Sequence, residues 1–328
     1  MPRALITGIT GQDGYYLSRF LLDKGYEVYG LLRGQNNPRR AEVERDLPEV
    51  HVLTGDVTDP SSLWHALTIS RPDEVYNLAA ISFVAYSWEN PYVTTQVTGT
   101  GVLNLLEAVR QFAGDEPGRV SFYQASSSEM YGTAATGRQS ETTRLAPCSP
   151  YGVAKAFGHH LTVTYRESYG MRAASGILFN HESPRRGAEF VTRKITRGAA
   201  RISLGAQDTI TLGNVDARRD WGFAGDYVEA MWLMLQQESV DDYVVATGET
   251  HSVRELLDVA FRRVGIADWT PYVRIDPGLF RPAEIDTFDA DTSKARTQLG
   301  WKPRVTFREL VTMMVDADLA EQKLLVGR

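Results

Sequence analysis

A tyrosine and a lysine stand four positions apart, at Tyr151 and Lys155, in a segment with helical periodicity. In a helix this spacing places both side chains on one face. An ammonium group close to a phenol stabilises the phenolate and lowers the pKa of the phenol. The phenolate can then take a proton from a hydroxyl group while a hydride leaves the carbon that carries it. The pair therefore predicts the oxidation of an alcohol.

Two further candidates precede this pair, at the end of a predicted strand. The hydroxyl of Ser127 can bond the reacting alkoxide oxygen, and Glu129 adds a second acid–base group that a simple dehydrogenase does not need. Ligands of open α/β sheets bind at the carboxyl ends of the strands, so this position suits a reaction site. We predict that Ser127, Glu129, Tyr151 and Lys155 are the catalytic residues.

Three glycines recur at intervals of three, at Gly8, Gly11 and Gly14, between the first predicted strand and the first predicted helix. The first permits a tight turn, the second lets a pyrophosphate approach the backbone, and the third lets the helix pack on the strand. Backbone amides and the helix dipole then favour an anion. This placement predicts a dinucleotide site whose loop residues are Gly8, Thr10, Gly11, Gln12, Asp13 and Gly14.

The end of the second predicted strand indicates which dinucleotide is bound. NAD sites usually carry an acidic residue there, whereas this chain has Arg33. A guanidinium group suits a 2′-phosphate, so we predict NADP. Asp56 is a candidate for the adenine edge, and the other residues expected to line the cofactor are Val57, Leu78, Ala79 and Ala80.

The elements that must position these residues follow an alternating pattern. Apolar runs predict strands at residues 4–7, 27–32, 50–54, 74–79, 119–125 and 173–179, and helical patterns at residues 14–24, 60–70, 91–112 and 150–169 separate them. Later helices are predicted at residues 190–200, 225–236, 253–264 and 307–323, and short strands at residues 210–212, 243–246 and 272–275. Strands separated by helices predict right-handed crossovers and a parallel sheet.

We therefore predict an α/β fold with a Rossmann-type, doubly wound parallel sheet and a smaller, mostly helical C-terminal lobe. Residues 1–180 would bind NADP, with residues 210–250 partly returning to that domain, and residues 181–328 would form an interleaved substrate lobe.

Composition excludes several classes of protein. Lys and Arg number 35 against 41 Asp and Glu, a formal net charge of −6, and nucleic-acid binders usually show a basic excess. A single cysteine excludes an internal disulfide framework and fits the cytoplasm, and the six scattered histidines show no metal-ligand spacing. The N-terminus does not resemble a signal peptide, and no run approaches the roughly 20 apolar residues of a membrane span. We expect a cytoplasmic protein with no nucleic-acid, membrane or metal partner.

Together these motifs resemble those of extended short-chain dehydrogenase/reductases, and more closely those of the GDP-mannose 4,6-dehydratase family. The resemblance covers nearly the whole chain, and its most specific part is the run NHESPRRG at residues 180–187. It implies a redox-neutral elimination. Tyr151 would deprotonate the sugar O4 while hydride passes from C4 to NADP. Glu129 would then remove the C5 proton and help the 6-hydroxyl leave as water, and hydride would return to C6 to give GDP-4-keto-6-deoxymannose.

The resemblance also implies further contacts. His181 and Arg186 would touch NADP. The nucleotide sugar, GDP-mannose or a related one, would be bound by Ser82, Ser128, Asn180, Val191, Lys194, Arg219, Arg281 and Glu284. The family usually has Gln-Ser-His-Val after Ala80, where this chain has Ile81-Ser82-Phe83-Val84, and Val93 stands where a tyrosine is expected. A homodimer or homotetramer is expected.

Two other interpretations stay open at this point. One is an NADPH-dependent 4-keto-sugar reductase or epimerase on the same scaffold, and the other is a cofactor-binding sensor without activity. A reductase would not need Glu129, and a sensor would not need to keep all four catalytic candidates. The sequence leaves open the exact nucleotide and sugar, the pathway, and the choice between dimer and tetramer.

Overall fold

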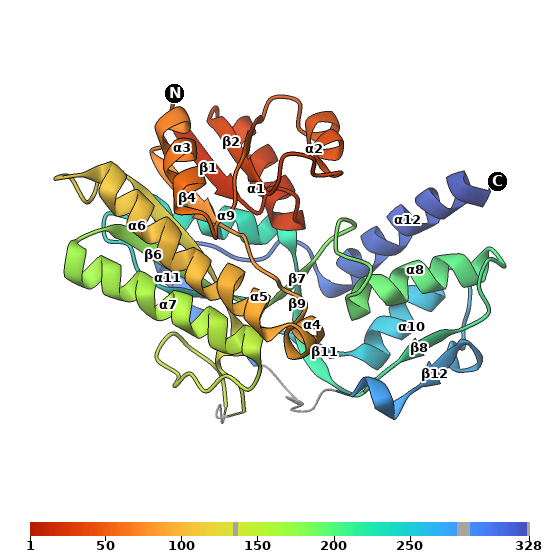
Figure 1. The fold of residues 1–328 in the computed structure, drawn as a ribbon. Coiled ribbons are helices and arrows are strands. Elements are labelled where there is room, and N and C mark those ends of the chain that lie inside the picture. Colours follow the sequence, from red (N-terminus) through yellow and green to blue (C-terminus); the bar gives the residue numbers. More distant parts are fainter. Residues whose placement is uncertain (134–136, 281–288, 327–328) are drawn as a thin grey trace.

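The computed structural model describes residues 1–133, 137–280 and 289–326 (Figure 1). Its centre is a seven-stranded parallel sheet in the order β10-β6-β5-β4-β1-β2-β3. The strands are β1 (Arg3–Thr7), β2 (Glu27–Leu32), β3 (His51–Thr54), β4 (Glu74–Asn77), β5 (Ser121–Ser127), β6 (Arg172–Leu178) and β10 (Tyr243–Val245). This sheet confirms the predicted doubly wound α/β class.

Helices cover both faces of the sheet, because successive side chains of a buried parallel strand enter opposite layers. In β1, Ala4 and Ile6 pack into one apolar layer and Leu5 into the other. The first layer involves α1 (Gln12–Asp23), α2 (Arg40–Asp46), α9 (Ala224–Leu235) and α11 (Ser293–Gln298). The second involves α3 (Pro60–Ser70), α6 (Gly101–Ala113) and α7 (Pro150–Tyr169).

A smaller part of the molecule follows residue 180 and has its own apolar core. That core joins α8 (Val191–Ser203), α10 (Val253–Arg263) and α12 (Phe307–Val326). Between it and the large sheet lie the three strands β7 (Asn180–Glu182), β9 (Arg218–Phe223) and β11 (Thr250–Ser252), in the order β11-β9-β7 (Figure 1). A two-stranded sheet pairs β8 (Ile210–Leu212) with β12 (Val273–Ile275), and short 3₁₀ turns lie at Ser128–Met130, Thr270–Tyr272 and Pro277–Leu279.

Strand β10 lies far along the chain from its neighbour β6 but belongs to the large sheet. Just before β10, Asp242 accepts two hydrogen bonds of 2.9 Å from Arg166 of α7 and one of 3.0 Å from the backbone N–H of Ser175. The chain therefore enters the smaller part of the molecule after β6 and returns to the large sheet at β10. The predicted division at residue 180 stays a prediction.

The predicted helix at residues 91–112 is not a single α-helix. It consists of α5 (Pro91–Thr95), a π-helical segment (Gln96–Thr100) and α6, and α4 (Val84–Glu89) precedes it. A side chain on Gly101 would lie 2.8 Å from Cγ2 of Val57, so glycine allows this close packing. Thr98 lies in the π segment, is buried and faces the loop after β4. Oγ1 of Thr98 accepts a hydrogen bond from the N–H of Ile81 in that loop at 3.0 Å. Such segments occur often at functional sites.

In the described parts of the chain, no helix is long and apolar enough to cross a membrane. Nor do three or more His, Cys, Asp or Glu side chains gather there in a group that could hold a metal ion.

We predict that Thr98 fixes the segment that begins at Ile81. Thr98→Val keeps the side-chain shape but leaves the part-buried N–H of Ile81 without its acceptor, at a cost of about 1 kcal/mol. Hydrogen exchange followed by mass spectrometry should show faster exchange at Ile81 in this variant, while Thr98→Ser retains the wild-type protection. Equal protection in both variants would show that the hydrogen bond does not order this segment.

Candidate active site

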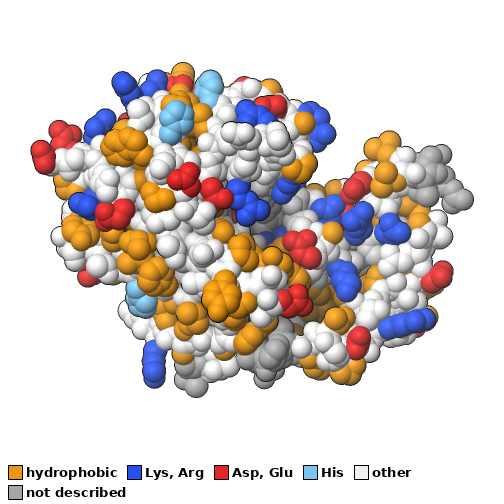
Figure 2. Space-filling model, viewed as in Figure 1, with side chains coloured by type: hydrophobic (Ala, Val, Ile, Leu, Met, Phe, Trp, Pro, Cys, Tyr) orange, Lys and Arg blue, Asp and Glu red, His pale blue; other side chains and the backbone are white. Residues whose placement is uncertain are grey.

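A cleft of about 1170 Å³ lies between the large sheet and the smaller part (Figure 2). Every predicted site residue within the described parts of the chain lines it, from the glycine loop to Lys194 and Arg219. Arg281 and Glu284 lie outside the described residues. Most of the lining residues follow the carboxyl ends of the parallel strands, which is where open α/β sheets bind ligands.

The glycine loop has the geometry of a dinucleotide cradle. Gly8 has a φ of +72°, and a Cβ on it would lie 2.8 Å from the carbonyl carbon of Leu78. The N–H of Gly11 donates to the carbonyl of Gly8 at 2.9 Å, and Gly11 itself is exposed at the start of α1. A Cβ on Gly14 would lie 2.7 Å from the carbonyl oxygen of Gly8. Any larger residue would disturb the loop, and the free amides at the start of α1 suit a pyrophosphate.

Gln12 ties this loop to the wall opposite it. Its Nε2 donates to the carbonyl of His181 at 2.7 Å, and the Oγ of Ser183 donates to its Oε1 at 2.8 Å. The side chain is buried. Gln12 therefore acts mainly through protein contacts, although the sequence predicts it only as a cofactor ligand.

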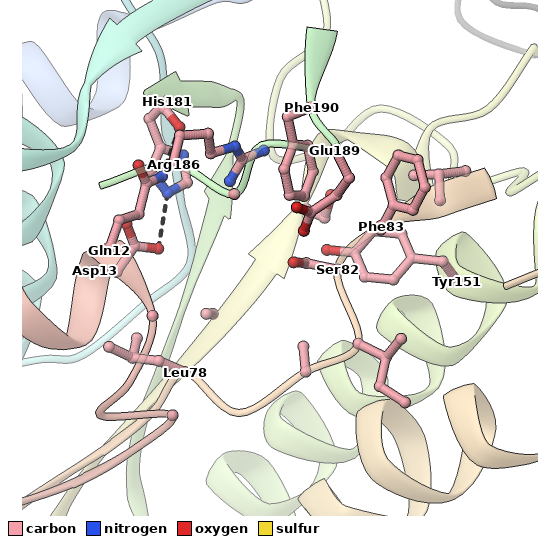
Figure 3. Close-up of a pocket in the computed structure, with 18 of the residues that line it drawn as sticks. Gln12, Asp13, Leu78, Ser82, Phe83, Tyr151, His181, Arg186, Glu189 and Phe190 are labelled. Atoms are coloured by element: carbon pink, nitrogen blue, oxygen red, sulfur yellow. Dashed lines mark hydrogen bonds and ion pairs between the residues drawn. The ribbon is translucent and has the colours of Figure 1, made fainter. Parts of the chain in front are cut away.

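Asp13 and His181 form an ion pair beside Gln12 (Figure 3). Nε2 of His181 lies 2.8 Å from Oδ2 of Asp13, and Nδ1 lies 2.8 Å from the carbonyl oxygen of Phe179. Both partners are acceptors, so both ring nitrogens donate and the ring is an imidazolium. Burial alone would lower the pKa of His181, but the charge and hydrogen bond of Asp13 outweigh it and raise that pKa. The ring also stacks on Tyr227, with centroids 4.8 Å apart.

Tyr151 and Lys155 lie in the first turns of α7. Ser149 caps this helix, because its Oγ accepts a hydrogen bond from the N–H of Gly152 at 3.0 Å. Pro150 is the first residue of the helix. Both residues fix where α7 begins and so place Tyr151, in its first turn, at the cleft. Nζ of Lys155 donates to the carbonyl of Ala125 at 2.7 Å and lies 5.7 Å from the centroid of the Tyr151 ring. Both side chains are buried.

The electrostatics of this pair differ from the expectation. Burial raises the pKa of Tyr151 above its usual value, although the hydrogen bond with Ser127 lowers it in part and the charge of Glu129 adds to the rise. Burial also lowers the pKa of Lys155 to about 8, against the opposing charge of Asp13. Desolvation is the largest influence on the pKa of both side chains at this depth.

Ser127 and Glu129 share the short turn that follows β5. Oγ of Ser127 accepts the N–H of Glu129 at 3.2 Å, which starts the 3₁₀ turn. A Cβ on Gly152 would lie 2.7 Å from the carbonyl oxygen of Glu129, so the turn packs directly on the start of α7. This packing brings Ser127, Glu129 and Tyr151 to one end of the cleft.

At the other end of the cofactor side lie Arg33 and Asp56. Arg33 is exposed and forms no ion pair with any residue that the structure describes. Oδ1 of Asp56 accepts the N–H of Thr58 at 2.9 Å and its hydroxyl at 2.7 Å, so this carboxylate also stabilises a turn. Arg33 is the group better placed to meet a ligand phosphate.

A stack of charged and aromatic side chains separates the two halves of the cleft, and the sequence predicts only Arg186 among its members. The guanidinium carbon of Arg186 lies 3.5 Å from the centroid of Phe190, and Phe190 meets Phe83 edge to face at 5.5 Å. Nε of Arg186 lies 3.1 Å from Oε2 of buried Glu182. Burial raises the pKa of Glu182. Glu182 lies within the run at residues 180–187 and Phe190 lies shortly after it, and the sequence assigns no individual role to either residue.

The remaining predicted contacts surround the outer half of the cleft. Lys194 lies near the start of α8, and buried Arg219 on β9 donates to the carbonyl of Arg218 at 2.7 Å. Their two cations lie on the smaller part of the molecule, away from the glycine loop, and suit a second anionic group. Figure 3 shows Ser82, Phe83, Tyr151 and Glu189 directed into one space, and Glu189 is a lining residue that the sequence did not reveal.

We predict that the Asp13–His181 pair makes stability depend on pH. The pKa of His181 is raised above 6.5, so its contribution is complete below that pH and fades as pH rises through the raised value. The pKa of Asp13 is lowered below 3.8, so its contribution is complete above that pH and fades as pH falls. In thermal unfolding, Asp13→Asn should lose most against wild type between pH 3.8 and 6.5.

The control is Asp115→Asn, which changes an exposed carboxylate after α6. It should lower the melting temperature by a small and nearly constant amount across the same range. A loss in Asp13→Asn that does not shrink at alkaline pH would contradict the ion pair.

Comparison with known proteins agrees with this geometry. The chain is 55% identical over 324 residues to GDP-mannose 4,6 dehydratase 1 of Arabidopsis thaliana, covering 96% of this chain and 89% of the relative. It is 48% identical over 340 residues to GDP-mannose 4,6 dehydratase of Drosophila melanogaster, covering 96% and 86%. Among solved structures, UDP-glucose 4-epimerase of Thermus thermophilus in complex with NAD superposes with a TM-score of 0.83 at 29% identity, covering 96% and 98%.

The model of the GDP-mannose 4,6 dehydratase family matches residues 5–314, which include the glycine loop, the turn after β5, the start of α7 and the run at residues 180–187. With this match over most of its length, the chain belongs to the GDP-mannose 4,6 dehydratase family.

Proposed function

We propose that this chain is a hydro-lyase that converts GDP-mannose to GDP-4-keto-6-deoxymannose with a catalytic nicotinamide cofactor. The observation that carries the proposal is the meeting of Ser127, Glu129 and Tyr151 at one end of the cleft. Alcohol oxidation needs only the serine and tyrosine, and the additional carboxylate suits removal of a carbon-bound proton. Membership of the family supports the same substrate.

We infer that the cofactor is NADP and that it lies along the large sheet. The glycine loop would hold the pyrophosphate, and Arg33, exposed and without an ion pair in the described structure, would meet the 2′-phosphate. A bound oxidised nicotinamide supplies a hydride acceptor and, once reduced, a hydride donor. Lys155 would hold the adjacent ribose, as its Nζ stands at the carboxyl end of β5.

Each catalytic side chain then has a separate task. Tyr151 takes the proton of the sugar 4-hydroxyl, and Ser127 donates a hydrogen bond to the same oxygen as it becomes a carbonyl. The ketone acidifies the neighbouring C5–H bond, and Glu129 removes that proton. Glu129 then returns the proton to the departing 6-hydroxyl, which leaves as water. Hydride lost from C4 would return to C6 by way of the bound nicotinamide, and the proton taken by Tyr151 would be delivered to C5, so protons and electrons balance within one sugar and no external reductant is consumed.

We also propose the division of labour between the two parts of the chain. Residues 1–180, together with β10, would form the cofactor domain, and residues 181–328 the nucleotide-sugar lobe. Lys194 and Arg219 would face the diphosphate of the sugar nucleotide. The single cysteine favours the reducing cytoplasm as its location.

The test is mass spectrometry of GDP-mannose incubated with the protein and a small amount of NADP, without reductant. Loss of one water molecule per sugar, with the total NADP unchanged, is the expected result. Stoichiometric consumption of NADPH on a 4-keto sugar, with no dehydration, would instead identify the reductase or epimerase.

We predict that Glu129→Gln separates oxidation from elimination. The variant should still oxidise C4, because Tyr151 and Ser127 are unchanged, but lose water about 10²- to 10⁴-fold more slowly. The signature is NADPH absorbance that persists without a 6-deoxy product. Tyr151→Phe is the comparison variant and should show no absorbance change. Dehydration by Glu129→Gln at the wild-type rate would contradict the acid–base role proposed for this residue.

We predict that Arg33 selects NADP over NAD. Arg33→Ala should weaken NADP binding roughly tenfold and leave NAD binding nearly unchanged, because only NADP carries the phosphate that the guanidinium meets. Calorimetric titration with both dinucleotides measures this. Arg39→Ala changes a neighbouring cation that pairs with Glu42, and serves as the control. Equal losses for NADP and NAD in Arg33→Ala would contradict the selection.

We propose that the protein is at least a homodimer joined through α4, α5 and α7. These helices expose large apolar side chains, including Tyr92 at 87%, Val153 at 54% and Phe157 at 45% (Figure 2). Such a patch marks a protein interface. Phe157→Glu should shift light scattering toward the monomer, whereas Ile69→Glu, at an equally exposed position of α3, should not. A wild-type monomer at micromolar concentration would contradict the proposal.

A further inference from the structure

A second cleft, of about 380 Å³, lies behind the first. It is formed by the loop after β10, by β11, and by the segment that leads from α11 into α12. Its volume is at the small end of the range of ligand pockets. None of the catalytic or binding residues discussed above lines it.

The floor of this second cleft is aromatic. The rings of His251 and Phe307 stack with centroids 3.9 Å apart and an interplanar angle of 7°, and Trp221 continues the stack at 6.0 Å from Phe307. Nδ1 of His251 lies 2.9 Å from Oε2 of Glu255, so this nitrogen carries the proton. Nε2 of His251 is buried and has no hydrogen-bond partner among the described residues. It is a polar atom at the cleft that a ligand can satisfy.

The rim of the cleft is basic. Lys302 is exposed and forms no hydrogen bond or ion pair with the described residues, and Arg296 donates only to the carbonyl of Thr247, at 3.2 Å. Arg304 is paired with Glu229. The only carboxylate among the described residues that line this cleft is Glu249, whose side chain is 79% exposed and whose Oε2 lies 3.9 Å from Nε2 of His251, beyond hydrogen-bond distance. Two available cations over an aromatic floor fit a phosphate group attached to a small flat molecule.

The second cleft shares a wall with the first. Trp221 on β9 lines both clefts. Arg219, two residues earlier on the same strand, lines the first cleft and pairs in register with His251 of β11. On the other side, Trp221 pairs in register with Asn180 of β7. The sheet β11-β9-β7 therefore joins the floor of the second cleft to predicted substrate contacts in the first.

Asp220 fastens the rim of the second cleft to this sheet. Its Oδ1 accepts the N–H and the hydroxyl of Thr247, both at 2.9 Å, and its Oδ2 accepts the N–H of Gly248 at 2.7 Å. Asp220 is fully buried and lies between Arg219 and Trp221. These three hydrogen bonds connect the rim of the second cleft directly to β9.

We propose that the second cleft binds a small phosphate-bearing ligand and that its occupancy strengthens nucleotide-sugar binding in the first cleft. The phosphate contacts Lys302 and Arg296, and the ligand donates a hydrogen bond to Nε2 of His251. The bound ligand orders the rim and β9, which pre-organises Arg219 for the diphosphate. The proposed effect on nucleotide-sugar binding in the first cleft rests on the proposed function, whereas the proposed ligand binding in the second cleft does not.

The binding test uses the full chain saturated with NADP, so that the dinucleotide site is filled. Inorganic phosphate and AMP are titrated separately by calorimetry, with sodium chloride at equal ionic strength as the salt control. We expect saturable binding that Lys302→Ala weakens at least tenfold. Lys323→Ala, which removes an exposed lysine of α12 that lines neither cleft, should leave it unchanged. Absence of saturable binding, or equal binding by Lys302→Ala and wild type, overturns the site.

The two probes also identify the ligand. Tighter binding of AMP than of phosphate assigns the aromatic floor to a base, and equal binding assigns the site to the phosphate alone. In both cases the second site stands.

The coupling test measures the KM for GDP-mannose with and without the tighter probe. We expect about a fivefold lower KM with an unchanged kcat in wild type and in Lys323→Ala, and no effect in Lys302→Ala. A KM that is unchanged or raised overturns the coupling. Calorimetry needs no turnover, so failure of the proposed dehydration would leave the binding result intact, and failure of binding would leave the dehydration intact.

Discussion

The architecture of the site depends on how the first turn of α1 is joined to β7. Two hydrogen bonds at Gln12 and the ion pair between Asp13 and His181 connect segments about half the chain apart. One segment carries the glycine loop and the other leads to the stack that divides the cleft. In this buried polar network Gln12 and both nitrogens of His181 have hydrogen-bond partners, whereas Oδ1 of Asp13 has none among the described residues. These contacts tie the glycine loop to the segment that enters the smaller part of the molecule.

The reactive end of the cleft is held by packing, and its electrostatics follow from burial. Tyr151, Lys155 and Ser127 are all buried. Desolvation raises the pKa of the Tyr151 phenol and lowers the pKa of the Lys155 ammonium group. A positive charge brought close to the phenol would favour the phenolate.

Much of this could be predicted from the sequence, for reasons that differ between features. The glycine loop and the Tyr151–Lys155 pair are local, because their geometry is set within one turn or one helix. Fully buried parallel strands appear as apolar runs, so the sheet was also predictable. The π-helical segment was not, because an extra residue in a helix leaves no periodic signal in the sequence. The rise in the pKa of Tyr151 caused by burial was not predicted, because burial depth is a tertiary property. Glu182, Phe190 and Glu189 depend on neighbours that the chain brings together only after folding.

The position of β10 has a consequence for synthesis of the chain. When the ribosome has released only the first 180 residues, β6 is the open edge of the sheet, and the layer that α9 covers is bare. An unpaired edge beside exposed apolar surface is prone to association with other chains. The partner strand and the covering helix emerge only with residues 224–245. The nascent polypeptide must therefore keep its largest sheet unfinished while the next segment is made, and a fragment ending at residue 180 would inherit that unfinished edge permanently.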